Sequence, residues 1–222
     1  MAYIINDTFF QGAIEVPNID EANSKSLTDL NRLIDEKCRL FMLNLLGYEL
    51  FTELDALLVD GMLPAVPESP TVDPIPAKWR NLITGTTYTV TDEPDRTWNG
   101  LNVVQGTFRT SLLAYYVYSF WLKQNVSFAS GVGEVRAEAK NAYNVNSTQR
   151  YTEVWNTFVE MYQGENCIGW EWWQYPHVYH VSGNYQYQNN TPVSLLQFLN
   201  DNETDFPNIT ATRYGIKNQL GL

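Results

Sequence analysis

The chain has 222 residues, of which 44% are hydrophobic and 14% aromatic, so it has ample material for a hydrophobic core and wholesale disorder is excluded. Its 14 basic and 25 acidic residues give a net charge of -11, which argues against a protein that gains affinity by neutralising nucleic-acid phosphates. The start, MAYIINDTFF, lacks a basic segment followed by a small-residue cleavage site, so we expect no signal peptide and synthesis in the cytosol. The longest apolar stretch, residues 112–122, is too short to span a bilayer, so we expect no membrane anchor.

Two helices are predicted in the first quarter of the chain, after an irregular lead. Apolar residues recur at steps of three and four over residues 26–46, which is typical of an amphipathic helix. Ser26 is expected to cap this helix by accepting a hydrogen bond from the backbone N–H of Asp29. Gly47 should end or kink it, and a second, shorter helix is predicted over residues 48–61.

A proline-rich connection and a small β element are expected between residues 61 and 100. Six of the ten prolines lie between positions 64 and 94, so residues 63–80 should form an extended connection rather than a long helix. Tyr88 and Val90 then alternate with threonines, a pattern that indicates a short strand or hairpin.

Two more long helices are predicted in the middle of the chain. Residues 103–124 have a wide apolar arc, which is typical of a central helix buried on more than one side. Glycines then interrupt the pattern, and residues 147–163 show a regular helical spacing of apolar residues, with Gly164 as the expected C-cap.

The last part of the chain, residues 165–222, is predicted to extend from a helical region formed by residues 1–164. It begins with an aromatic extension, and Thr191 and Pro192 are expected to start a short helix as N-cap and first-turn residue. Residues 204–222 have no clear period and should form an extended arm that orders on a partner. The expected fold class is mainly α: a helical bundle of three to four main helices with a small β element and an extended C-terminal arm.

The stretch NCIGWEWWQYPHVYH, residues 166–180, contains residue types that bind zinc. These candidate ligands are Cys167, Glu171, His177 and His180. Pro176 and the dense aromatics disfavour a helix that would bring the histidines together, and the chain has no second ligand cluster. The Gly-x-Gly of SGVGEVRAEAK also lacks the lysine and third glycine of phosphate-binding loops. We therefore expect no metal, no cofactor and no enzymatic activity.

The aromatic side chains of the same stretch allow two other interpretations. Trp170, Trp172, Trp173, Tyr175 and Tyr179 could present flat faces that stack on sugars, as in a carbohydrate-binding module. They could equally be core and interface residues, because Trp and Tyr bury a large area while keeping one hydrogen-bonding atom. We favour the interface interpretation and keep the carbohydrate-binding module as the alternative.

The order of these parts resembles a known family. The helix that runs into LLGYELFTEL, the aromatic helix SLLAYYVYSFWLKQNVSF, the link GVGEVRAEAKNAY and the helix RYTEVWNTFVEMY are together similar to the head-to-tail connector proteins of tailed bacteriophages. The likeness is to the adaptor ring proteins of phages that infect Bacteroidetes, including the crAss-like group. It covers about residues 20–164 and consists of helix patterns without a catalytic signature.

The resemblance implies a structural virion protein that is assembled in the host cytoplasm. Such subunits form a ring, usually of about twelve copies, between the portal and the tail, and DNA passes through it without sequence-specific binding. The resemblance assigns residues 26–46, 103–124 and 147–163 to the bundle and residues 204–222 to a strap between subunits or rings. The residues that we expect at interfaces are Trp170, Trp172, Trp173, Tyr175, His177, Tyr179, Phe206 and Tyr214.

Overall fold

The computed structural model describes residues 3–19, 24–68, 72–91, 95–126, 128–130, 133–135, 147–164, 178–181, 184–187, 191–210, 212–215 and 217. Over these residues the fold is mainly α, as expected. The helices are α1 (Lys25–Leu57), α2 (Ala77–Thr84), α3 (Leu112–Val126), α4 (Ser147–Gln163) and α5 (Leu195–Asp201). None of the helices in the described part of the chain is long and apolar enough to cross a membrane.

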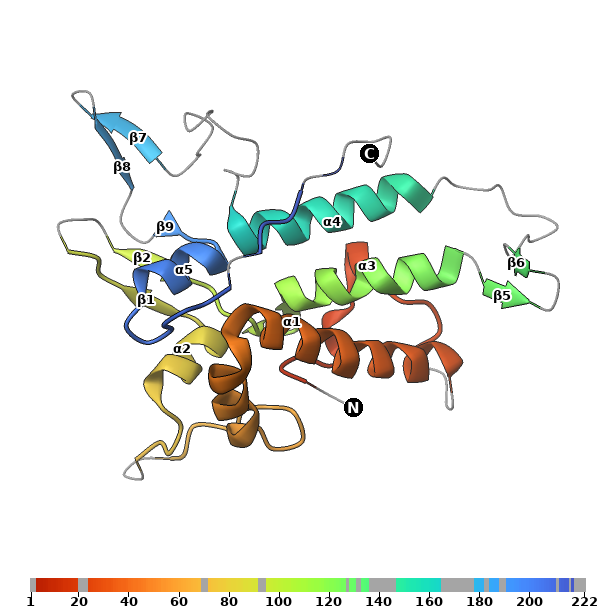
Figure 1. Ribbon diagram of the computed structural model, residues 1–222, viewed down its shortest axis with the longest axis horizontal. Helices are drawn as coiled ribbons and strands as arrows, with labels where there is room; N and C mark the ends of the chain where they lie inside the picture. The colour runs from red at the N-terminus through yellow and green to blue at the C-terminus, as the bar shows by residue number, and fades with distance from the viewer. Residues whose placement is uncertain are drawn as a thin grey trace.

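Helices α1, α3 and α4 run side by side along the long axis of the molecule, with α3 in the middle (Figure 1). Their shared core is aromatic: the ring of Phe41 on α1 lies 5.1 Å from that of Tyr116 on α3 and 5.6 Å from that of Tyr162 on α4. Residues on several sides of α3 are fully buried, among them Leu113, Ala114 and Val117. The central position predicted for this helix is therefore confirmed.

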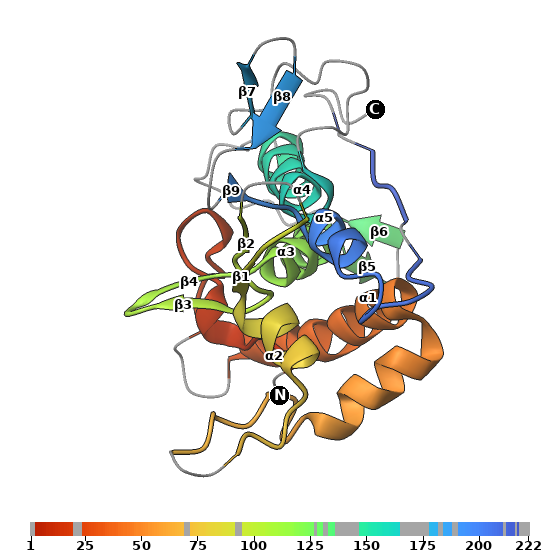
Figure 2. The same cartoon turned by 90° about the vertical axis from the view of Figure 1, so that its left-hand side faces the viewer.

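Helix α1 is broken at Gly47, whose backbone angles (φ 74°, ψ 171°) are not helical. The two parts lie at a steep angle to each other (Figure 2), which confirms the predicted kink. The cap differs from the prediction, because the hydroxyl of Ser24, and not of Ser26, accepts the first backbone hydrogen bond, from Leu27 at 3.3 Å. The N-cap thus lies two residues earlier than predicted, and the helix begins at Lys25.

A small sheet lies at the end of the molecule where α2 and α5 also lie (Figure 1). Strand β1 (Thr86–Tyr88) pairs antiparallel with β2 (Arg96–Trp98), which confirms the predicted β element, and β2 pairs parallel with β9 (Thr191–Pro192). The remaining strands form separate antiparallel hairpins: β3 (Val103–Gln105) with β4 (Phe108–Thr110), β5 (Phe128–Ser130) with β6 (Gly133–Val135), and β7 (Val178–Val181) with β8 (Asn184–Tyr187).

A buried ion pair joins this sheet to α5. Arg96 of β2 and Asp201 of α5 are 2.5 Å apart, and the hydroxyl of Tyr88 donates to the same carboxylate at 2.7 Å. Asp201 also accepts from Gln197 on its own helix at 2.7 Å. Because both charged groups are almost fully buried, removal of either one would leave an uncompensated charge in the core.

Three predicted segments differ from the structure. The helix expected from residue 103 starts at Leu112, because Gly106 adopts φ +62° in the turn of the β3–β4 hairpin, a conformation that no helix contains. The extended connection ends at Pro76, after which residues 77–84 form helix α2 with Trp79, Leu82 and Ile83 buried.

The third difference is at the start of α5. Thr191 and Pro192 pair with β2 instead of starting a helix, and Ser194 is the N-cap, accepting from the N–H of Gln197 at 3.3 Å. Helix α4, in contrast, spans residues 147–163 as predicted. Gly164 (φ +80°) ends it by donating its N–H to the carbonyl of Glu160 at 2.8 Å.

The irregular lead before α1 belongs to the core, which the sequence did not indicate. Its buried residues are Tyr3, Ile4, Ile5, Phe9, Phe10, Ile14 and Val16. Side chains far along the chain hold its backbone: Asn102 donates to the carbonyl of Ile4 at 2.8 Å, and Arg150 donates to that of Ala13 at 3.0 Å.

Candidate functional site

Most residues expected at an interface lie outside the described part of the chain. This applies to Trp170, Trp172, Trp173, Tyr175 and His177, and also to the candidate zinc ligands Cys167 and Glu171. Tyr179 and His180 belong to β7, where they pair with Gln186 and Tyr185 of β8. Over the described residues, the structure contains no cluster of three His, Cys, Asp or Glu side chains that could hold a metal. Phe206 and Tyr214 remain as the predicted interface residues whose side chains can be placed.

Phe206 is a core residue, so its assignment to an interface was wrong. Its side chain is 1% exposed, and its ring lies 5.6 Å from that of Trp79 and 6.0 Å from that of Phe198. The turn after α5 places it there, because its N–H donates to the carbonyl of Asn202 at 3.0 Å. Phe206 therefore joins α2 to α5 and is not accessible to a partner chain.

Tyr214 lies in an extended stretch, residues 212–215 with 217, that runs along the surface of α4 (Figure 1) and that we call the C-terminal segment. The ring of Tyr214 packs edge-on against three rings of α4, at 5.7 Å from Trp155, 5.2 Å from Phe158 and 5.1 Å from Tyr162. Burial in this pocket raises the pKa of its hydroxyl. The segment expected to be a free arm is thus held by its own chain.

Two side-chain amides of α4 bind the backbone of the C-terminal segment, and we call this pair the amide clamp. Gln163 donates to the carbonyl of Tyr214 and accepts from its N–H, both at 2.9 Å. Asn156 forms the same pair of hydrogen bonds with the backbone of Lys217, again at 2.9 Å. Between them, the indole N–H of Trp155 donates to the carbonyl of Gly215 at 2.8 Å.

The spacing of the clamp follows from the geometry of the two elements. Asn156 and Gln163 are seven residues apart, which is two helical turns, or about 10.5 Å along one face of α4. Tyr214 and Lys217 are three residues apart, which is about 10 Å in an extended chain. The two spans are nearly equal, so the clamp fits an extended backbone rather than particular side chains. Because Gln163 pairs with Tyr214 and Asn156 with Lys217, the segment runs antiparallel to α4. The only sequence signal for the amide clamp is an Asn and a Gln seven residues apart, beside aromatic residues, on one helix. This signal does not identify a binding site unless the position of the C-terminal segment is known.

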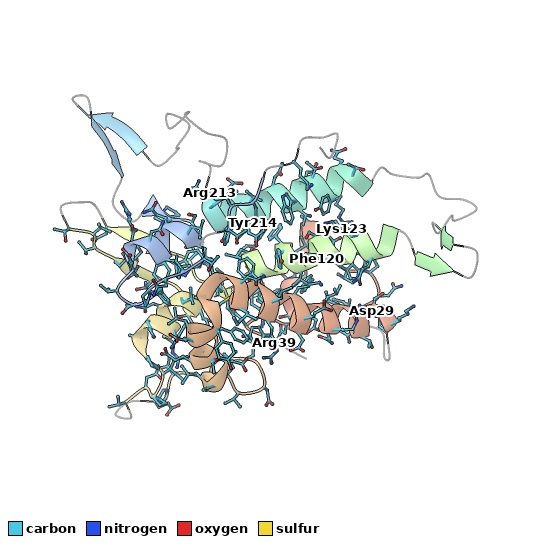
Figure 3. All side chains as sticks on the ribbon, viewed as in Figure 1. Asp29, Arg39, Phe120, Lys123, Arg213 and Tyr214 are labelled. Atoms are coloured by element: carbon cyan, nitrogen blue, oxygen red, sulfur yellow. The ribbon has the colours of Figure 1, made fainter. Side chains whose placement is uncertain are left out.

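Four basic side chains lie on or beside the aromatic rings of α3 and α4, and we call them the cationic cluster. They are Arg32, Lys37, Lys123 and Lys217. The ammonium of Lys123 lies over the rings of Tyr151 (5.0 Å) and Phe120 (5.4 Å), as Figure 3 shows for Phe120 and Lys123 between α3 and α4. The ammonium of Lys37 also lies over the ring of Phe120, at 5.0 Å.

The remaining members of the cluster are bound to the same aromatic group or beside it. Lys217 lies 5.8 Å from the ring of Tyr151, and Arg32 donates to the side chain of Gln124 at 3.3 Å. Aromatic faces attract cations without neutralising them. Over the described residues, the ion pairs of the cluster are those of Arg32 and Lys37 with Glu36, so the cluster keeps a net positive charge.

An acidic groove of about 320 Å³ lies at the kink of α1. Its lining residues are Leu46, Gly47, Tyr48, Glu49, Leu50, Glu53, Pro207 and Asn208. The kink frees the carbonyl of Leu45, which accepts instead from the N–H of Thr210 at 2.9 Å, so the chain after α5 forms one wall. Burial raises the pKa of Glu53, but hydrogen bonds from Lys78 and Trp79 lower it by more, and the net pKa is below its usual value. Glu53 is therefore ionised at neutral pH.

Comparisons of the chain with models of protein families, with curated proteins and with solved structures found no match.

Proposed function

We propose that the protein is a structural virion component, the subunit of a head-to-tail connector ring that joins the portal of a tailed bacteriophage to its tail. Its role is mechanical rather than enzymatic, because the ring continues the DNA channel between the two. The antiparallel packing of α1, α3 and α4 supports the helical bundle that the resemblance implies.

The observation that carries the proposal is the way in which α4 holds the C-terminal segment. The hydrogen bonds of the amide clamp go to main-chain atoms, and the pocket between Trp155 and Tyr162 takes one ring, so the site depends little on how the segment is connected to the rest of its chain. A segment from a neighbouring subunit can make the same contacts. Such an exchange would link subunits, which is the role expected for an arm in a connector.

The charge of the chain fits a ring around DNA. Many copies of a subunit with a net charge of -11 give a channel that repels phosphates, so DNA passes without adhering. The expected partners are further copies of the chain, about twelve in a closed ring, with the portal protein on one side and an adjacent ring or tail protein on the other.

Electron microscopy of the purified protein, alone and mixed with the portal protein of its phage, tests the proposal. We expect rings in at least one of the two samples. A chain that stays monomeric under both conditions would contradict the proposed function. A variant that ends at Thr210 is the matched control, because it keeps Phe206 in the core but lacks Tyr214, and it should be a folded monomer that forms no rings.

The aromatic stretch provides a second test that separates this proposal from a carbohydrate-binding module. The double variant Trp172→Ala/Trp173→Ala should lose ring assembly while its monomer stays folded, because these residues are expected at a contact between subunits. Glycan binding by the parent that is lost in Trp173→Ala would support the carbohydrate-binding module instead.

A further inference from the structure

Charge is unevenly distributed along this chain. Residues 40–77 contain six acidic residues and no lysine or arginine, and residues 199–212 contain three acidic residues and again no basic one. The fold brings parts of both stretches together, because Glu49 and Glu53 from the first and Pro207 and Asn208 from the second line the acidic groove. The cationic cluster, in contrast, is built from residues of α1, α3 and the C-terminal segment.

The acidic groove has the features of a site for a cationic side chain. Of its two carboxylates, that of Glu53 is paired with Lys78 at 2.9 Å, whereas Glu49 is exposed and forms no ion pair among the described residues. Beside Glu49, the ring of Tyr48 is 76% exposed. A carboxylate next to an open aromatic face attracts a lysine or arginine both by charge and by cation–π interaction. Leu46 and Leu50 add an apolar lining that suits the methylene stem of such a side chain.

The cationic cluster has the complementary features. Lys123 is exposed, and neither Lys123 nor Lys217 has a carboxylate partner among the described residues. The rings of Tyr151 and Phe120 hold the ammonium of Lys123 in place, so little conformational freedom remains to be lost when it meets an anion. The cluster is thus a fixed positive surface in a strongly acidic protein.

The cluster and the groove of one molecule cannot neutralise each other. Arg32 and Gly47 are 15 residues apart on α1, which is roughly 22 Å along the helix. This is well beyond the screening length of about 8 Å at physiological ionic strength. A second copy of the chain can bring the two surfaces into contact, and because they are different surfaces, the contact repeats from copy to copy and can close into a ring.

We infer that the cationic cluster of one copy, centred on Lys123 and Lys217, binds the acidic groove of the next copy at Glu49 and Tyr48. This inference rests on the proposed ring and identifies the two surfaces that meet between neighbours. The contact sets the direction of assembly, since a groove beside a groove or a cluster beside a cluster places like charges together.

Charge reversal tests the contact better than salt does, because salt screens both this attraction and the general repulsion between acidic chains. Lys123→Glu makes the cluster less positive, and Glu49→Lys makes the groove less negative, at positions where both side chains are exposed. Association is measured by sedimentation velocity over a concentration series, and circular dichroism checks that each monomer is folded. The matched controls are Arg213→Glu, an exposed cation of the C-terminal segment outside the cluster, and Glu160→Lys, an exposed acid on α4 outside the groove.

We expect each single reversal to raise the dissociation constant by about tenfold or more, and the controls to change it by less than about twofold. An equimolar mixture of the Lys123→Glu and Glu49→Lys proteins should associate more tightly than either alone, because each variant offers the surface that the other needs. Rings that form equally well in both single variants would overturn this inference and leave the proposed function standing. A parent protein that forms no assembly, alone or with the portal protein, would overturn both.

Discussion

Replacement of both residues of the amide clamp, Asn156→Ala with Gln163→Ala, should release the C-terminal segment without unfolding the protein. The change removes four hydrogen bonds to the backbone of Tyr214 and Lys217, each of 2.9 Å. At about 0.5–1.5 kcal/mol net for each bond, the segment loses roughly 2–6 kcal/mol of local stability. Its opening should become at least about thirtyfold more frequent, while the packing of α1 against α3 is untouched.

Hydrogen–deuterium exchange measures this release directly. The N–H groups of Tyr214 and Lys217 both donate to the clamp, so their protection from exchange should fall at least about thirtyfold in the double variant. The control is Gln149→Ala on the same helix, whose side chain contacts Glu153, and it should leave the segment protected. Unchanged protection of both N–H groups in the double variant would refute the reasoning, because it would mean that the ring of Tyr214 and the hydrogen bond from Trp155 to Gly215 hold the segment without the clamp.

Three further predictions concern the core. Phe206→Ala should lower the free energy of unfolding by about 3–5 kcal/mol in urea titrations, because it empties a buried site, whereas Phe108→Ala, at a side chain 56% exposed, should change it by less than about 0.5 kcal/mol. Gly85→Ala should lower the melting temperature more than Gly106→Ala: both residues have positive φ, but a Cβ at position 85 would lie 2.6 Å from the carbonyl oxygen of Trp98, and one at 106 meets open space. Burial, followed by charge effects from neighbouring groups, raises the pKa of Tyr116 to about 12, so the neutral phenol is favoured in the folded state. The stability that this neutral phenol contributes is complete below about pH 10, the pKa in the unfolded chain, and is lost as the pH rises from there toward 12. Urea titrations over this pH range should therefore show a less steep loss of stability in Tyr116→Phe than in the parent.

Local patterns in the sequence predicted the elements whose stability is local. Helix α4 has a regular apolar period and a glycine at its end, and both its bounds were predicted. Gly47 likewise marks the kink of α1, because its effect depends on its own backbone. The β3–β4 hairpin was predicted as helix because Phe108 lies four residues before Leu112, which is helical spacing, although the turn at Gly106 decides the conformation.

The candidate site was predicted in part, for reasons that are tertiary. Tyr214 was identified as a contact residue from its aromatic character, but its partner surface is on its own chain, and nothing near it in sequence indicates α4. Phe206 shows the same limit more strongly, because an aromatic residue in an irregular tail has the same sequence signal in the core as at an interface. The amide clamp and the cationic cluster combine residues more than 50 positions apart, so only the fold reveals them.

The burial of the apolar side chains between positions 3 and 16 has a consequence for how the protein is made. Their backbone is bound by the side chains of Asn102 and Arg150, and the core is closed at its other end by Phe206 against Trp79. A nascent chain on the ribosome therefore exposes these apolar residues at least until α4, which carries Arg150, has been synthesised. This part of the core therefore closes only after α1, α3 and α4 are all available, and a chain cut short before α4 should leave it exposed.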